Sequence, residues 1–276
     1  MPKPDHIPLH TLDGKLVPGL FVKRITASSH HETMHHAHRD DFYLFVLMTR
    51  GCAILAVDFE EHSLRAGEAL VVSPSQVHFP VSSSPDAELW VLALAPEYLL
   101  PRETEIMAQY SLHVSPISLA GETDAADISA LFGILFGRQH QSAVAIPLAS
   151  SIKALMLCSI TRGHGQRTSR YMSVTLRFKD LLEAHLSKTK SPSGYASMMA
   201  ISEVYLNEAV KAVTGMSVSD FILYQVVIHA KRSLLFTALP VQDIALSLGY
   251  EDCAYFSRLF KKKTGLSPAH YRKNLG

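Results

Sequence analysis

Apolar residues in the first third of the chain occur in short runs that turn-forming residues separate. The clearest runs cover residues 42–48, 53–57, 69–72 and 89–95. Breaks such as Gly51 and Gly67 recur about every eight to twelve residues, a spacing typical of short strands in an all-β barrel or sandwich. The pattern predicts a small β-barrel over about residues 16–95.

After residue 124 the apolar positions recur at helical spacing. They lie three and four residues apart over about residues 125–139 and again over 143–161, which predicts two amphipathic helices. Their apolar faces suit either packing against the barrel or pairing of two protomers. Glycines and polar residues over 162–169 then indicate a linker.

The last third of the chain contains an approximate internal repeat, with copies at residues 195–215 and 244–265. Each copy predicts a short helix, a tight turn and a second helix, the pattern of a helix-turn-helix unit. Matching positions of the second helices carry the expected caps, namely Ser202 and Asp252 at the start and Gly215 and Gly265 at the end. Between the copies, a capping-box pattern at Ser217 opens a helix predicted to reach about residue 236.

Length and composition favour two domains. The chain has 276 residues, 47% of them hydrophobic, which exceeds one typical domain and can bury a sizeable core. We therefore predict a multidomain α+β fold. Residues 1–165 are expected to form the barrel with flanking helices. Residues 166–276 are expected to form an all-α domain in which a linker helix joins two helix-turn-helix motifs.

The net charge of +1 is an average over two different halves. Residues 1–170 carry 13 Lys and Arg against 17 Asp and Glu, a net −4, whereas residues 171–276 carry 13 against 8, a net +5. A basic C-terminal third suits phosphate binding. Twelve of the 15 histidines precede residue 170, so the first half offers a different chemistry.

Three features of the sequence bear on the cellular compartment: the cysteines, the start of the chain and the longest apolar windows. Cys52, Cys158 and Cys253 lie too far apart for a disulfide framework or a paired-cysteine zinc site, which favours a reducing compartment. The start of the chain has no apolar run typical of a signal peptide, and the apolar window at residues 143–160 contains Pro147 and Lys153, which disfavours a membrane span. We expect a cytoplasmic protein.

The outward faces of the second helices carry candidate DNA contacts. Arg258 can bind guanine with two hydrogen bonds, Asn207 can pair with adenine, and Glu208 can accept from a cytosine amino group. The full set of candidate base-reading residues is Val204, Asn207, Glu208, Cys253, Ala254, Ser257 and Arg258. Candidate phosphate contacts, which set register without reading sequence, are Ser202, Lys211, Lys261, Lys262, Lys263, Arg272 and Lys273.

The stretch from Asp243 to Lys261, with Gly265, Ser267-Pro268 and Tyr271-Arg272, resembles the signature of the AraC/XylS family of bacterial transcription regulators. Upstream positions resemble that family's first helix-turn-helix, so the resemblance covers about residues 173–274. It implies binding to double-stranded promoter DNA and recruitment of RNA polymerase, and it selects the same base-reading residues. The small pair Cys253-Ala254 departs from the polar readers common in relatives, which leaves Arg258 as the main reader of the second unit.

In the first half, His36-Ala37-His38 and the later His78 resemble the two-part pattern of cupin barrels, in which such histidines surround a metal. The glutamate that the cupin pattern requires is absent from residues 39–43. Regulators with this domain order often use the cupin-like barrel as a metal-free effector pocket or dimerisation scaffold, so we expect no cofactor. A three-histidine site of His36, His38 and His78 for Zn²⁺ or Fe²⁺ is the alternative.

A small-molecule effector is expected to bind inside the barrel, and a homodimer is expected. Candidate pocket residues are His36, His38, Tyr43, His78 and Trp90, although Trp90 also suits plain core packing. The chain is expected to be a regulator, in particular an activator, and not an enzyme. Two alternatives stay open: a cupin-type metal-dependent enzyme or metal sensor with a DNA-binding tail, and an oxidant sensor that uses Cys253.

Overall fold

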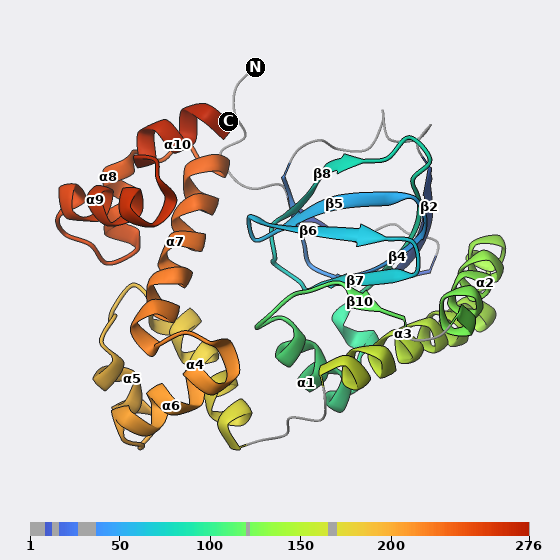
Figure 1. Cartoon of the computed structure of the whole chain (residues 1–276), viewed down its shortest axis with the longest axis horizontal. Helices are drawn as coiled ribbons and strands as arrows, with labels where there is room; N and C mark the ends of the chain where they lie inside the picture. Colours follow the sequence, from blue (N-terminus) through green and yellow to red (C-terminus); the bar gives the residue numbers. More distant parts are fainter. Residues whose placement is uncertain (1–8, 13–16, 27–36, 120–121, 165–169, 276) are drawn as a thin grey trace. The chain divides into compact units, whose positions relative to one another are not determined.

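The computed structural model describes residues 9–12, 17–26, 37–119, 122–164 and 170–275. The chain divides into two compact units, Leu9–Gln166 and a second that contains Arg167–Gly276 (Figure 1). They are called here the N-terminal unit and the C-terminal unit. Each is built around its own hydrophobic core.

The N-terminal unit is β-rich and contains two antiparallel sheets, which confirms the predicted fold class. The larger sheet has the order β10-β7-β4-β9-β2, with β2 at Leu20–Thr26, β4 at Tyr43–Arg50, β7 at Glu68–Val72, β9 at Glu88–Leu94 and β10 at Ile117–Ser118. The smaller has the order β6-β5-β8, with β5 at Cys52–Val57, β6 at Glu60–Arg65 and β8 at His78–Ser83. A short strand β1 (Leu9–His10) pairs in parallel with β3 (Arg39–Asp40).

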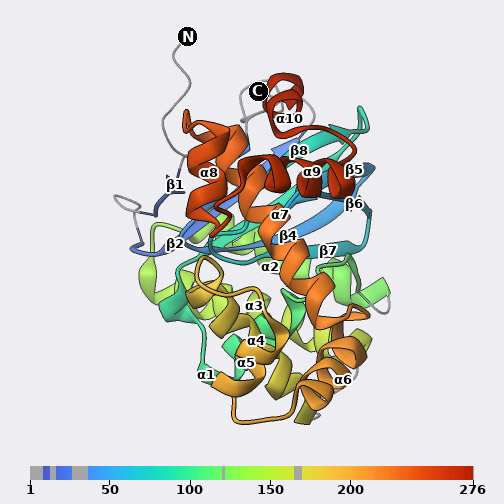
Figure 2. The same ribbon diagram turned by 90° about the vertical axis from the view of Figure 1, so that its left-hand side faces the viewer.

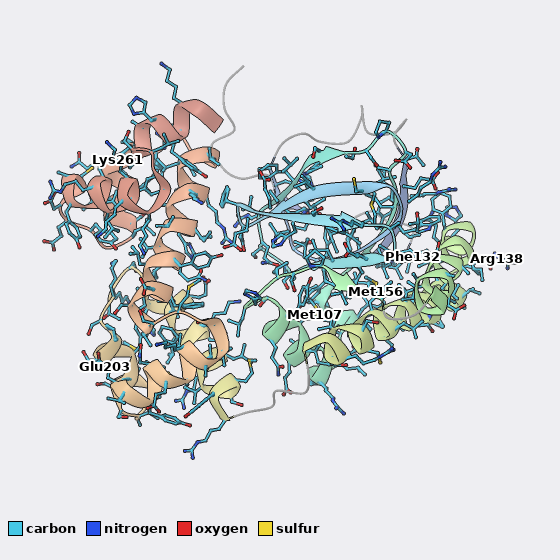
Figure 3. The ribbon with its side chains drawn as sticks, in the orientation of Figure 1. Met107, Phe132, Arg138, Met156, Glu203 and Lys261 are labelled. Atoms are coloured by element: carbon cyan, nitrogen blue, oxygen red, sulfur yellow. The ribbon has the colours of Figure 1, made fainter. Side chains whose placement is uncertain are left out.

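Both faces of the larger sheet are covered. Because side chains alternate along a strand, Phe45 and Leu47 of β4 point to one face and Leu44 and Val46 to the other. The first face packs against the helices α1 (Pro101–Tyr110), α2 (Glu122–Arg138) and α3 (Ser142–His164), where Met107, Phe132 and Met156 are fully buried (Figure 3). The second face is turned toward the smaller sheet.

The C-terminal unit is entirely helical within its described residues. Its helices are α4 (Arg170–His185), α5 (Pro192–Met198), α6 (Glu203–Thr214), α7 (Val218–Phe236), α8 (Val241–Ser247), α9 (Cys253–Thr264) and α10 (Pro268–Leu275). Figures 1 and 2 show the long helix α7 running from the group of α4, α5 and α6 to the group of α8, α9 and α10.

Each end of α7 has a small aromatic core. At the first end, Phe178 of α4 contacts Tyr195 and Phe221, with ring centroids 5.3 and 5.9 Å apart. At the other end, the ring of Phe260 meets that of Tyr271 edge-on at 5.4 Å. The helix α7 therefore joins two helix-turn-helix units that are each packed separately.

By length and composition α3 could cross a membrane, as could α6 and α7 together despite a bend of 61° between them. The packing of α3 resembles that of a core helix instead. Ile152 and Met156 of α3 are fully buried, and the Lys153 ammonium donates to the Tyr98 carbonyl oxygen at 2.6 Å and to the Glu103 carboxylate at 2.5 Å. This ion pair fixes α3 against α1.

Candidate nucleic-acid interface and ligand cavity

The second helix of each helix-turn-helix unit starts at a side-chain cap. The Ser202 hydroxyl accepts a hydrogen bond from the Tyr205 N–H at 3.1 Å, and the Asp252 carboxylate accepts from the N–H groups of Ala254 and Tyr255 at 2.8 and 2.9 Å. The two hydrogen bonds to Asp252 lower the pKa of its carboxyl group, and the bond from the Tyr255 N–H has the larger effect. The N-terminal caps predicted for α6 and α9 are confirmed.

The turns between the helices use backbone conformations that favour glycine. Gly215 and Gly265 end α6 and α9 with φ angles of 74° and 79°. Within the turns, Ala200 has φ 55° and Gly249 has φ 75°. A Cβ atom on Gly249 would lie 2.0 Å from the Ser187 carbonyl oxygen, so only glycine fits there.

Both second helices present a polar or small-residue face and bury an apolar one. Leu206 and Val210 of α6 and Phe256 and Phe260 of α9 are buried. Of the candidate base-reading residues, those that are exposed are Val204, Glu208, Ala254 and Arg258, and those that are half-buried are Asn207, Cys253 and Ser257. Tyr255, which the sequence did not single out, is also half exposed on α9.

Asn207, which is predicted to read adenine, also makes a hydrogen bond within the C-terminal unit. Its side-chain oxygen accepts a hydrogen bond at 3.0 Å from the N–H of Val218, the first residue of α7. The first N–H groups of a helix have no acceptor within the helix, and the Asn207 side-chain oxygen satisfies one of them with one of its two lone pairs. At the matching positions of the second unit stand Ser257 and Pro268, and proline has no N–H to satisfy.

Arg272, a predicted phosphate contact, also makes hydrogen bonds within the C-terminal unit. This half-buried guanidinium donates to the carbonyl oxygens of Leu234 and Leu239 at 2.9 and 2.6 Å, so it holds α10 against the C-terminal end of α7. Lys263 forms an ion pair with Asp220 at 3.4 Å. The remaining candidates are exposed, as Figure 3 illustrates for the labelled Lys261: Ser202, Lys211, Lys261, Lys262 and Lys273.

A cavity of about 560 Å³ lies between the two sheets of the N-terminal unit. Its lining is mostly apolar, with Leu44 and Val46 of β4 on one side and Leu55 of β5 on the other. The polar and charged side chains that line it are His10, Lys23, His38, Asp40, His78, Thr11 and Ser82. Sequence patterns gave no reason to place His10, Lys23 or Asp40 there.

Two predicted pocket residues lie on the face of the larger sheet that is turned away from the cavity. Tyr43 and Trp90 belong to the core between that sheet and the helices, where the Trp90 ring stacks on Phe132 at a centroid distance of 5.8 Å. His38 and His78 do line the cavity. His36, predicted both for the pocket and for a metal site, lies outside the described residues.

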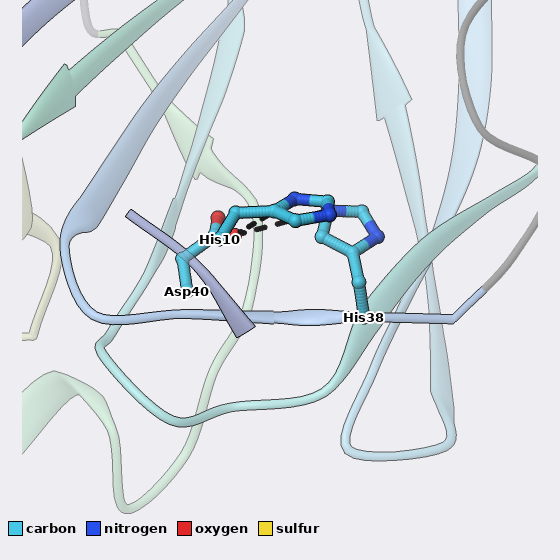
Figure 4. Close-up of side chains that lie close together, drawn as sticks. All are labelled: His10, His38 and Asp40. Carbon is cyan, nitrogen blue, oxygen red and sulfur yellow. Dashed lines mark ion pairs between the residues drawn. The ribbon is translucent and has the colours of Figure 1, made fainter. Parts of the chain in front are cut away.

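The polar end of the cavity brings four side chains together. His10 and His38 stack with ring centroids 4.6 Å apart (Figure 4), and His38 meets His78 at 4.2 Å. One Asp40 oxygen lies 3.5 Å from His10 Nδ1 and 4.0 Å from His38 Nε2, and the other lies 3.4 Å from His78 Nε2. We call this group the His–Asp cluster.

Burial controls protonation in the His–Asp cluster. Burial, with a smaller contribution from the charge of Asp41, raises the pKa of Asp40 to about 7. Burial and the neighbouring His38 lower the pKa of His78 to about 3, so this imidazole is neutral near pH 7. It then has one proton for two acceptors, the Gln76 carbonyl oxygen 3.2 Å from Nδ1 and the Asp40 carboxylate beside Nε2.

Two families of known proteins match the chain. Residues 22–158 match the AraC-like ligand binding domain, and residues 195–274 match a helix-turn-helix domain. The HTH-type transcriptional activator RhaR of Escherichia coli strain K12 is 25% identical over 247 residues, which cover 85% of this chain and 86% of RhaR.

Solved structures give partial or distant matches. The C-terminal domain of AraT, a response regulator from Geobacillus stearothermophilus, is 32% identical over 38% of this chain and 88% of that domain, with a TM-score of 0.36. ToxT from Vibrio cholerae O395 covers 93% of this chain and 98% of its own, at 11% identity and a TM-score of 0.47.

Proposed function

Since this chain belongs to the AraC family of DNA-binding transcription regulators, we propose that it activates transcription in the cytoplasm by recruiting RNA polymerase to promoters. The observation that carries the proposal is the pair of capped, exposed helices α6 and α9 on a basic unit. The relative RhaR is a transcriptional activator, which supports the direction of regulation.

The helix α7 sets the separation of the two units. Its 19 residues span about 28 Å at ~1.5 Å per residue, close to the ~34 Å between major-groove faces one DNA turn apart. This length lets α6 and α9 enter successive major grooves on one side of a duplex. Arg258 on α9 is the proposed principal reader, with Val204 and Glu208 on α6.

Replacing Arg258 tests this assignment. The Arg258→Ala variant should lose its preference at one base pair, with a cost of about 1–3 kcal/mol at the best site, because a guanine loses its two hydrogen bonds. Affinities for a set of duplexes that differ by single base pairs measure the effect.

A matched control is Lys262→Ala on the same helix. Removal of this exposed cation should weaken binding to all sequences alike and reduce the salt dependence by about one counterion. If Arg258→Ala keeps the wild-type preference at every base pair, the assignment of the reader is wrong.

We propose that the cavity between the two sheets holds the small-molecule effector. Its volume of about 560 Å³ lies within the ~300–1,000 Å³ range of ligand sites. Because Leu44, Val46 and Leu55 line one part and the His–Asp cluster another, the cavity suits a largely apolar molecule with a polar end. Lys23 supplies a positive charge to the same lining.

We further propose that two protomers pair through α2 and α3. These helices pack on each other and leave large apolar side chains exposed to solvent on more than one side. The exposed residues are Ile134, Phe136, Val144, Ile146 and Leu155.

A further inference from the structure

The His–Asp cluster is assembled from segments that are distant in sequence and fixed by backbone hydrogen bonds. The Asp41 N–H donates to the His10 carbonyl oxygen at 3.2 Å, which fixes β1 beside β3. His38 and His78 exchange two backbone hydrogen bonds, at 3.2 and 2.9 Å. Positions 38 and 40 are two apart on extended chain, so their side chains share a face. The donor atoms are therefore preorganised.

The spacing of these atoms suits a single bound ion. One ligand atom from each of His10, His38 and Asp40 lies within 4.8 Å of the other two (Figure 4). Two ligands at ~2.0–2.1 Å from a tetrahedral Zn²⁺ are themselves about 3.4 Å apart. Asp40 Oδ1 lies 3.5 Å from His10 Nδ1 and 4.0 Å from His38 Nε2, near that value, and the other oxygen, Oδ2, lies 3.4 Å from His78 Nε2.

An independent observation points to a missing partner. Among the described residues, Asp40 Oδ1 and His78 Nε2 are buried without any hydrogen-bond partner, and the residues are only 3% and 5% exposed. Such atoms usually find a partner because desolvation is costly. His78 Nδ1 lies 3.2 Å from the Gln76 carbonyl oxygen. That is the contact by which metal-binding imidazoles commonly fix the other nitrogen as a lone-pair donor.

We propose that the His–Asp cluster binds a divalent transition-metal ion, with a ring nitrogen each of His10 and His38 and an Asp40 carboxylate oxygen as ligands and with His78 Nε2 beside the other Asp40 oxygen. Imidazole and carboxylate donors suit ions such as Zn²⁺ and Fe²⁺. The set differs from the three-histidine site suggested by sequence, because His10 and Asp40 enter it. The site lies in the wall of the cavity, so the ion faces the space proposed for the effector.

Zinc titration of the full chain tests the site. After removal of metal with a chelator, the wild-type protein should bind about one equivalent of Zn²⁺ in calorimetry, and Zn²⁺ should raise its melting temperature. The variants His10→Ala and Asp40→Asn should each weaken binding at least about 100-fold. His10 is partly exposed and Asp40→Asn keeps the side-chain shape, so melting of the metal-free variants verifies that both fold.

Two controls separate this site from other histidines. His113→Ala, which removes an exposed histidine of the same unit, should leave Zn²⁺ binding unchanged. A variant with alanine at His30, His31, His35 and His36 should also retain it. The proposal is overturned if the wild-type protein binds much less than one equivalent of Zn²⁺. So would a site that survives His10→Ala and Asp40→Asn but is lost with the four histidines.

Discussion

The side-chain amide of Asn207 joins α6 to α7 through one hydrogen bond to the Val218 N–H. Replacing Asn207 with alanine leaves that N–H without its acceptor, at a cost of roughly 1–2 kcal/mol. We expect Asn207→Ala to lower the urea midpoint of the C-terminal unit while the ratio of affinities for two different DNA sites stays constant.

The Asn207→Asp variant is the matched control for that bond. An aspartate keeps the acceptor oxygen and places a negative charge at a helix start, where it is favourable, so stability should be retained. A variant Asn207→Ala with unchanged stability and altered base preference would show that Asn207 reads DNA after all.

The same residue shows the limit of periodicity as evidence. Asn207 follows Leu206 directly and precedes Val210 by three residues, so helical spacing places it at the edge of the buried face of α6, and an amide there still suits adenine. The spacing does not reveal that the next helix begins beside it. Arg272 is similar, because it precedes the exposed Lys273 while its guanidinium donates to the carbonyl oxygens of Leu234 and Leu239.

At the scale of elements, the turns between the helices of the two units make a matched pair. Ala200 and Gly249 occupy corresponding positions with positive φ, and both turns are closed by the same type of backbone bond, from Ile201 to Ala196 and from Tyr250 to Ala245. A non-glycine residue in this conformation is strained by about 1–2 kcal/mol. The first unit therefore carries a strain that the second avoids.

Exchanging the two residue types tests that comparison. Ala200→Gly should stabilise the C-terminal unit by up to about 1 kcal/mol, since relief of strain exceeds the added entropy of the unfolded chain. Gly249→Ala should destabilise it by about 3 kcal/mol, because the new Cβ meets the Ser187 carbonyl. Urea unfolding curves measure both. Equal effects of the same sign would contradict the proposed difference between the turns.

Strands were predictable from sequence only where they lie in the interior. The runs that become β4, β5, β7 and β9 are apolar because both of their faces are covered or nearly so. The strand β6 was not predicted because it lies at a sheet edge and has no apolar run. Leu64 is its one buried residue, and Glu60, Glu61 and Arg65 face solvent.

The direction of side chains in the larger sheet was not predictable for a related reason. When one face of a strand is polar, alternation shows which residues point inward. In β4 and β9 both faces are buried, one by the helices and one by the second sheet. The residues around Tyr43 and Trp90 are therefore apolar on both sides, and the sequence does not show whether these two side chains point into the helix-covered core or into the cavity. His10 was unpredictable because only the pairing of β1 with β3 brings it to Asp40.

At the scale of the whole molecule, charge divides as the two units do. The acidic, histidine-rich half contains the cavity and the His–Asp cluster, and the basic half contains the paired helix-turn-helix units. The near-zero net charge of the whole chain therefore does not exclude DNA binding, because DNA phosphates are attracted by the local positive charge of the C-terminal unit.

Dimerisation would double the number of DNA-reading helices that act together. Two linked protomers on adjacent sites bind with an avidity that can exceed that of one protomer by ~10²–10⁴-fold. Charged residues at exposed apolar positions of α2 and α3 should prevent pairing through these helices, because an unpaired charge in a buried interface is strongly unfavourable. We expect the double variant Ile134→Asp, Ile146→Asp to sediment as a monomer and to bind a two-site promoter fragment about 100-fold more weakly.

The control for dimerisation is Arg138→Asp, which changes an exposed charge in the last turn of α2, one turn from Ile134, and replaces no apolar side chain (Figure 3). It should remain dimeric, because loss of an exposed charge costs an interface little when its apolar contacts are kept. The double variant should keep wild-type affinity for a fragment with one site, since its reading helices lie in the other unit. A double variant that still sediments as a dimer would rule out α2 and α3 as the interface. A monomer that binds the two-site fragment as tightly as the wild type would instead show that pairing is not needed for promoter binding.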